Sequence, residues 1–165
     1  MFFGAFIFIY LFILLFAVGV LIGYIFYLIT VSSTLDLCLP HNRKMNPGQV
    51  WLVLIPLFGI YWHFVVVAHL ADSIAWEMRS RNLVPEEERP AYNVGLWSLI
   101  LRCAGFIPFL GILASLAGLV LWIIHWSKVS RYKKILAGSQ PNFSAPFMYQ
   151  QPYGNYGGQG PYQQP

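Results

Sequence analysis

The side chains with the clearest chemical potential are a histidine, an aspartate and a serine that lie close together in the sequence. His69, Asp72 and Ser73 have the three- and four-residue spacing that brings side chains together on one face of a helix. A histidine beside a carboxylate can relay protons. The same three side chains can equally form a hydrogen-bonded cluster at a membrane interface. Two ligands do not make a zinc site, which needs three or four.

A second candidate is the basic residue Arg102, which lies deep in an apolar segment. A charge at the centre of a membrane costs roughly 3 kcal/mol unless it is paired or reaches water. We therefore expect Arg102 to be paired, to extend towards the headgroups, or to contact an anion or a lipid headgroup. Cys38 and Cys103 form no CxxC motif or other metal-ligand spacing. With no nucleophile–base pair in the sequence, we expect no enzyme activity, no cofactor and no metal.

The composition is typical of a membrane protein. Hydrophobic residues make up 58% of the chain and charged residues 10%, against about 25% charged residues in soluble domains. The net charge of +4 does not indicate nucleic-acid binding, because the basic residues are spread along the chain. One basic cluster directly follows an apolar segment, where it would anchor the chain at anionic lipid headgroups; it contains Lys128, Arg131, Lys133 and Lys134.

Four apolar stretches predict an all-α integral membrane bundle with four transmembrane helices. A crossing needs roughly 20 apolar residues, and the first stretch contains no charge. The apolar run that starts at Ala91 is too long for one crossing and is interrupted near Pro108, so we expect a hairpin there. Three crossings are the alternative, because the first arm of that hairpin is short enough to be re-entrant or tilted. The expected helices are 2–31, 47–82, 91–106 and 111–134, within a transmembrane domain of residues 1–137.

The second expected helix has a defined start and is longer than a bilayer requires. Asn46 is a typical N-cap, Pro47 suits the first turn, and Gln49 is placed to complete a capping box. A helix over 47–82 would be roughly 50 Å long, against a hydrocarbon core of about 30 Å. We expect Pro56 to kink this helix within the membrane and its last turns to project into the cytoplasm.

The basic residues also predict the orientation. With four crossings, Arg43 and Lys44 lie on one side, while most of the other basic residues lie on the opposite side with both termini. The positive-inside rule makes the more basic side cytoplasmic. With three crossings, the C-terminus remains cytoplasmic. We therefore expect a multi-pass cell-membrane protein whose N- and C-termini both face the cytoplasm.

Small residues and the C-terminal tail offer interaction surfaces. Small residues four apart let helices approach closely, either within one bundle or between two chains; they are Gly19 with Gly23, Gly111 with Ser115, and Ala114 with Gly118. Residues 138–165 are rich in Gly, Pro, Gln and Tyr and carry no charge, which predicts a disordered tail. That tail would serve as a tether, a docking peptide, a self-associating segment or a simple linker.

Several motifs resemble those of a group of small bacterial multi-pass membrane proteins of unknown function. They are NRKMNPGQVW at 42–51, IPLF at 55–58, LADS at 70–73, FIP at 106–108 and WIIHW at 122–126. The resemblance implies a bacterial inner membrane but carries no activity. We expect a non-enzymatic scaffold or adaptor whose partners are the lipid bilayer and either a second copy or another membrane protein. The alternative is an oligomeric small transporter or channel subunit.

Overall fold

The computed structural model describes residues 2–105, 107 and 111–141, with side chains described from Phe6 onward. Within these residues all regular structure is helical, which confirms the all-α prediction. Three helices are long and apolar enough to cross a membrane, namely α1, α2 and α4. The elements are α1 (Phe2–Asp36), the 3₁₀ helix η1 (Pro47–Leu54), α2 (Phe58–Ser80), α3 (Tyr92–Ala104) and α4 (Gly111–Gly138).

The region expected to form one helix over 47–82 is divided into η1 and α2. The start is as predicted, because Asn46 and Gln49 form the capping box. The residue before a proline avoids the helical conformation, and Ile55 is accordingly extended, with φ −73° and ψ 120°. Leu57 then adopts a positive φ of 63°. Pro56 therefore lies in a turn that reverses the chain, where the sequence predicted a kink.

Two other helices are longer than expected, and α3 is short. The first helix continues from residue 31 to Asp36, and its hydroxyl groups there find partners within the helix. Ser33 and Thr34 each donate a hydrogen bond to the carbonyl four residues earlier, over 2.6 and 2.7 Å. The last helix continues past Lys134 to Gly138. At 13 residues, α3 is about 20 Å long, which is less than the roughly 30 Å of a hydrocarbon core. A fourth crossing stays a prediction.

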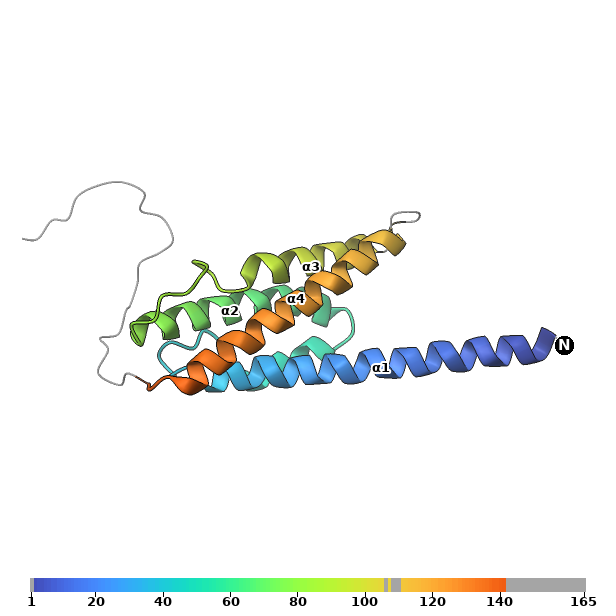
Figure 1. Cartoon of the computed structure of the whole chain (residues 1–165). Helices are drawn as coiled ribbons and strands as arrows, with labels where there is room; N and C mark the ends of the chain where they lie inside the picture. Colours follow the sequence, from blue (N-terminus) through green and yellow to red (C-terminus); the bar gives the residue numbers. More distant parts are fainter. Residues whose placement is uncertain (1, 106, 108–110, 142–165) are drawn as a thin grey trace, which may run out of the picture.

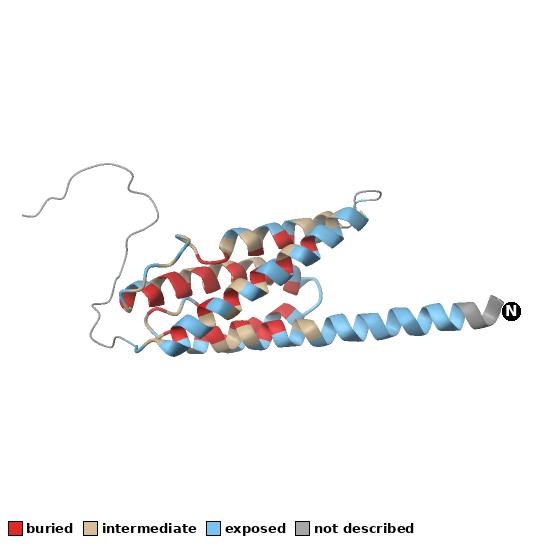
Figure 2. Cartoon of the chain, viewed as in Figure 1, coloured by how far each residue is buried: buried red, intermediate tan, exposed pale blue. Residues whose placement is uncertain are grey.

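The helices α1, α2 and α4 run in the same direction, and η1 and α3 lead the chain back between them (Figure 1). The core lies where the second half of α1 packs against the others (Figure 2). Its residues recur at helical spacing: Tyr27, Leu28, Val31 and Leu35 on α1, Val66, Leu70, Ile74 and Met78 on α2, and Val129, Tyr132 and Leu136 on α4. Residues 6–22 of α1 are exposed and project beyond this core (Figure 2).

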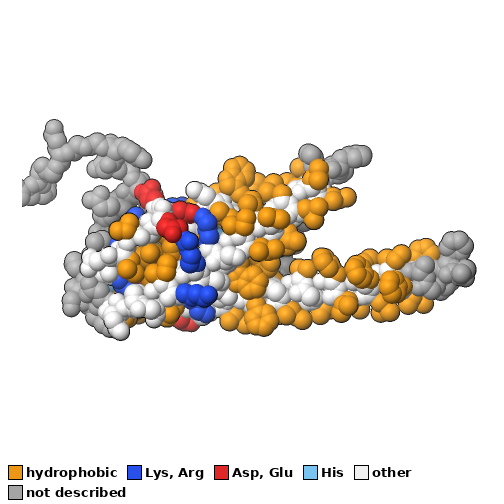
Figure 3. Space-filling view, viewed as in Figure 1, with side chains coloured by type: hydrophobic (Ala, Val, Ile, Leu, Met, Phe, Trp, Pro, Cys, Tyr) orange, Lys and Arg blue, Asp and Glu red, His pale blue; other side chains and the backbone are white. Residues whose placement is uncertain are grey.

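The charged residues gather at the end of the molecule where α1, α2 and α4 finish (Figure 3). The loop after α1 belongs to this end, since the Lys44 ammonium lies 4.3 Å from the centroid of the Trp76 ring. In the four-crossing scheme, Arg43 and Lys44 lie on the side opposite the other basic residues. The contact of Lys44 with Trp76 on α2 instead places this loop at the same end as those residues. The reason is that η1 is only 8 residues long, about 16 Å, and does not carry the chain across a membrane before α2 begins.

The last turns of α2 do not stand clear of the protein. The loop between α1 and η1 and the end of α4 enclose them, so Ser73 and Glu77 are fully buried. Projection of these turns into the cytoplasm stays a prediction. Of the expected tail, residues 142–165 lie outside the described residues.

Candidate functional site

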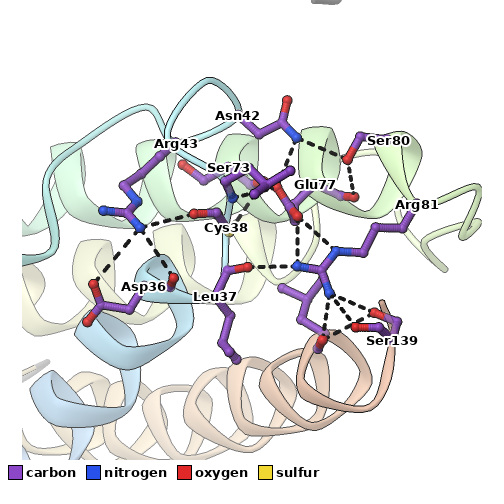
Figure 4. A network of polar contacts seen from close by, with 12 residues as sticks. Asp36, Leu37, Cys38, Asn42, Arg43, Ser73, Glu77, Ser80, Arg81 and Ser139 are labelled. Atoms are coloured by element: carbon purple, nitrogen blue, oxygen red, sulfur yellow. Dashed lines mark hydrogen bonds and ion pairs between the residues drawn. The ribbon is translucent and has the colours of Figure 1, made fainter. Parts of the chain in front are cut away.

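A buried ion pair organises the charged end of the molecule (Figure 4). Glu77 and Arg81 lie one turn apart on α2, and Arg81 Nη2 is 2.7 Å from Glu77 Oε1. The other carboxylate oxygen, Oε2, accepts hydrogen bonds from the Leu39 backbone N–H at 2.8 Å and from Asn42 Nδ2 at 2.9 Å. With both oxygens occupied, this carboxylate holds the loop after α1 against α2.

The Arg81 guanidinium extends the same network to two other helices. Its Nη2 donates to the carbonyl of Leu37, next to the end of α1, at 2.7 Å. Its Nη1 donates to the Leu136 carbonyl near the end of α4, at 2.6 Å, and to Ser139 Oγ at 2.8 Å. A buried charge that is paired and fully hydrogen-bonded is well placed to fix structure and poorly placed to bind a ligand. We therefore assign this network a structural role.

The predicted cluster of His69, Asp72 and Ser73 does not form a connected site. Ser73 Oγ donates to the His69 carbonyl at 2.7 Å and accepts from the Lys44 backbone N–H at 2.8 Å. Asp72 is instead bound by Arg89, with N···O distances of 2.8 and 2.9 Å. The His69 ring has a buried Nδ1 with no hydrogen-bond partner among the described residues. The geometry therefore lacks the histidine–carboxylate contact that proton relay requires.

The pair between Asp72 and Arg89 ties the α2–α3 loop to α2. Burial lowers the pKa of Arg89, but the hydrogen bond and charge of Asp72 outweigh it and hold that pKa above its ordinary value. The Arg89 guanidinium also lies over the Tyr92 ring, 3.8 Å from its centroid. A bidentate arginine–carboxylate pair stacked on an aromatic ring orients the start of α3.

The basic cluster on α4 is partly neutralised by the acidic α2–α3 loop. Lys128 is paired with Glu87, and Arg131 with Glu86. Lys133 is half-buried and Lys134 is exposed. The predicted lipid-headgroup anchor thus leaves fewer free cations than the sequence implies.

The small residues divide into two groups. On α4, a Cβ added to Gly118 would lie 3.3 Å from the Arg102 backbone nitrogen, so this glycine lets α3 and α4 pack closely. Gly111 and Ser115 lie against Gly105, at the end of α3. On α1, a Cβ added to Gly19 or Gly23 would have no neighbour within 4 Å. The α4 group therefore packs inside the chain, and the α1 group faces away from it.

Arg102 lines a cleft of about 1110 Å³ between α1, the η1–α2 turn and the α3–α4 pair. Its guanidinium lies 5.7 Å from the centroid of the Tyr24 ring on α1. Most of the lining is apolar; its other polar side chains are Tyr24, His63, Ser115 and Trp122, with the thiol of Cys103. The structure thus places Arg102 at a cavity, far from His69 and Asp72 at the charged end.

A buried aromatic–histidine cluster beside this cleft was missed in the sequence. The hydroxyls of Tyr24 and Tyr27 lie 3.3 and 3.2 Å from the two ring nitrogens of His63. On α4, His125 Nδ1 donates to the Ala91 carbonyl at 3.0 Å. Tyr24 and Tyr27, three residues apart in an apolar helix, could have indicated this cluster from the sequence. A buried tyrosine hydroxyl needs a hydrogen-bond partner, and a histidine on another helix can supply it.

None of these arrangements supplies a metal centre, since no three His, Cys, Asp or Glu side chains of the described residues come together to hold an ion. Comparison with models of protein families, with curated proteins and with solved structures finds no match to this chain.

Proposed function

We propose that this protein is a non-enzymatic membrane scaffold or adaptor that binds another membrane helix through the first half of α1. The observation that carries the proposal is the isolation of this segment. Residues 6–22 are all exposed, over a length of about 26 Å. In a bilayer, such a segment can be covered by lipid or by another helix.

The glycines of α1 favour a helix as the covering partner. Lipid is as apolar as a helix face, so association in membranes depends on close packing, which small residues permit. The glycine and serine positions of α4 are occupied by α3 within the chain, whereas Gly19 and Gly23 have open space around them. The partner is a second copy of this chain or a different membrane protein.

The same proposal includes an orientation. By the positive-inside rule, the charged end faces the cytoplasm, in a bacterial inner membrane as the sequence resemblance implies. The chain leaves α4 beside Arg81, which bonds Ser139, so the C-terminal tail starts on the cytoplasmic side and can tether or dock a partner there. The start of α1 lies at the opposite end of the molecule (Figure 1). This orientation differs from the expectation that both termini are cytoplasmic, which stays a prediction.

Crosslinking in intact membranes followed by mass spectrometry tests the proposal. We expect the double variant Gly19→Leu, Gly23→Leu to lose crosslinks through α1, because leucine side chains prevent close helix approach. Ala17→Leu is the matched control, since it adds the same bulk on the other side of the helix. A shortened chain ending at Pro141 keeps the Ser139 contacts. A crosslinked partner that this chain no longer captures is one that the tail binds. A chain that stays monomeric and captures no partner contradicts the proposal.

The alternative, an oligomeric transporter or channel subunit, is favoured by one observation, the cleft at Arg102. The His69, Asp72 and Ser73 group adds nothing to it, because Asp72 is paired with Arg89. Proteoliposome flux that falls in Arg102→Ala and not in Asp72→Ala would support this alternative. Absence of flux from the wild-type chain would exclude it.

A further inference from the structure

The cleft beside Arg102 is shaped for a long apolar chain. Its volume of about 1110 Å³ is slightly larger than the roughly 300–1,000 Å³ found for sites of small molecules. The walls are mostly aliphatic side chains, among them Val20 and Leu21 on α1 and Leu116 and Leu119 on α4. The notch between the projecting α1 and the other helices is visible in Figure 3, bordered by apolar side chains. Lipid therefore has direct access to the cleft.

Arg102 is a cation without a carboxylate partner among the described residues. The five ion pairs among the described residues all lie at the charged end, and so does every carboxylate in them. Arg102 lies ten residues beyond Tyr92, so it is about 15 Å further along α3. An uncompensated cation at that depth is costly, which favours an anion from outside the chain.

A second polar group at the cleft has no partner either. Trp122 lines the cleft and is 9% exposed, and its indole Nε1 has no acceptor among the described residues. A buried N–H without an acceptor costs about 1–3 kcal/mol. The nearby Tyr24 hydroxyl is already bonded to His63. Arg102 and Trp122 thus provide a charged donor and a neutral donor with no acceptor supplied by the described chain.

We infer that this cleft binds an anionic phospholipid, with its phosphate on Arg102 and an acyl chain along the apolar walls. Guanidinium groups pair with phosphate oxygens through two parallel hydrogen bonds. A small soluble anion would leave the apolar walls exposed, and a zwitterionic lipid would bring a second cation close to Arg102. The lipid belongs to the leaflet opposite the charged end, because Arg102 lies away from that end. The cleft uses Val20 and Leu21 of α1, whereas the glycines proposed for helix association, Gly19 and Gly23, do not line it.

Native mass spectrometry of the full chain, released from nanodiscs of equal phosphatidylglycerol and phosphatidylcholine, tests the inference. Phosphatidylcholine offers the same phosphate acceptors, but its choline cation is repelled by Arg102, so we expect phosphatidylglycerol to be retained several-fold over phosphatidylcholine. Arg102→Gln should abolish the preference, and Arg102→Lys should keep part of it. Arg79→Gln, an exposed residue at the charged end, should leave it unchanged. Equal retention of both lipids, or a preference that Arg102→Gln leaves intact, overturns the inference.

The two cysteines give a second measurement that needs no variant. Cys103 is exposed and lines the cleft, whereas Cys38 is buried outside it. We expect N-ethylmaleimide to label Cys103 several-fold more slowly in phosphatidylglycerol vesicles than in phosphatidylcholine vesicles, with Cys38 unlabelled in both. Equal labelling rates overturn the inference even if Arg102→Gln fails to fold. A co-purified free fatty acid, with no retained phospholipid, also overturns it, because the ligand would then be a carboxylate.

Discussion

The Glu77 carboxylate and the Arg81 guanidinium lie 2.7 Å apart with their side chains 0% and 2% exposed, and between them they hold three segments of the chain. Glu77 binds the loop after α1, and Arg81 binds Leu37 just after α1, Leu136 in the last turn of α4, and Ser139 just after α4. One cation therefore binds backbone carbonyls at the ends of both α1 and α4. The pair therefore contributes to the relative position of α1, α2 and α4.

Glu77→Gln should destabilise the protein strongly. The substitution keeps the shape of the side chain and leaves Arg81 buried without its counter-charge. Removing one partner of a buried pair costs about 3–5 kcal/mol. Unfolding of the purified chain in detergent, followed by circular dichroism, measures the change in free energy. Arg79→Gln is the control, because this neighbouring arginine is exposed and such changes stay within about 0.5 kcal/mol. Equal stability of the two variants would contradict the structural role of the pair.

Cys38 should be inert towards alkylating reagents in the folded protein. Burial, with the nearby Glu77 carboxylate, raises the pKa of its thiol from 9.0 to about 12. The thiolate is the reactive form, so Cys38 should stay unlabelled at pH 9 and react once the chain is unfolded in dodecyl sulfate. Because the folded pKa lies above the unfolded one, the associated stability is present below pH 9 and is lost between about pH 9 and pH 12. Labelling of folded Cys38 at pH 8 would sink this prediction.

The sequence predicted the helical class, the apolar stretches and the capping box at Asn46, because these depend on local composition and spacing. It did not predict where the chain reverses. A proline such as Pro56 permits either a kinked helix or a turn, and the choice depends on whether Val50 and Val53 of η1 can be buried against the rest of the chain. A reversal at this point moves the preceding loop to the other end of the molecule.

The polar contacts were predicted less well, and the reason is their distance along the chain. His69, Asp72 and Ser73 are neighbours on a helix, but their partners come from elsewhere: Arg89 binds Asp72, and the Lys44 backbone binds Ser73. The burial of Glu77 was not predicted from the sequence, because a single glutamate near a helix end is usually exposed. Nothing local indicates that a loop will cover it.

Gly95→Ala should loosen the packing of α3 against α2 and α4. A Cβ at this position would lie 2.7 Å from the His125 ring and 2.7 Å from Val67 Cγ1. His125 cannot withdraw without losing its hydrogen bond to the Ala91 carbonyl. Overpacking costs about 1–3 kcal/mol, which exceeds the gain of about 1 kcal/mol that alanine brings within a helix.

The control for this glycine is Gly138→Ala at the end of α4, where a Cβ meets nothing within 4 Å. Thermal unfolding in detergent compares the two variants. We expect a lower midpoint for Gly95→Ala and an unchanged or slightly higher midpoint for Gly138→Ala. A higher midpoint for both would mean that α3 is free to shift away from His125.

Asp72→Asn should release the α2–α3 loop without unfolding the protein. The Asp72–Arg89 pair is bidentate, but its side chains are 25% and 26% exposed, so solvent screening limits its contribution to about 1 kcal/mol. The loop carries Glu86, Glu87 and Glu88, which are sites for a glutamate-specific protease. We expect faster cleavage there in Asp72→Asn, and a similar acceleration of the wild-type chain in high salt, which weakens an exposed pair.

Asp36→Asn is the matched control for that substitution. Asp36 also faces an arginine, but its 4.0 Å contact with Arg43 is long and its side chain is 63% exposed. It lies at the end of α1, away from the α2–α3 loop, so its loss should leave cleavage at Glu86–Glu88 at the wild-type rate. If both variants are cleaved equally fast, net charge at this end governs the loop. If neither changes, the pairs of Lys128 and Arg131 with the loop carboxylates hold it without help from Asp72.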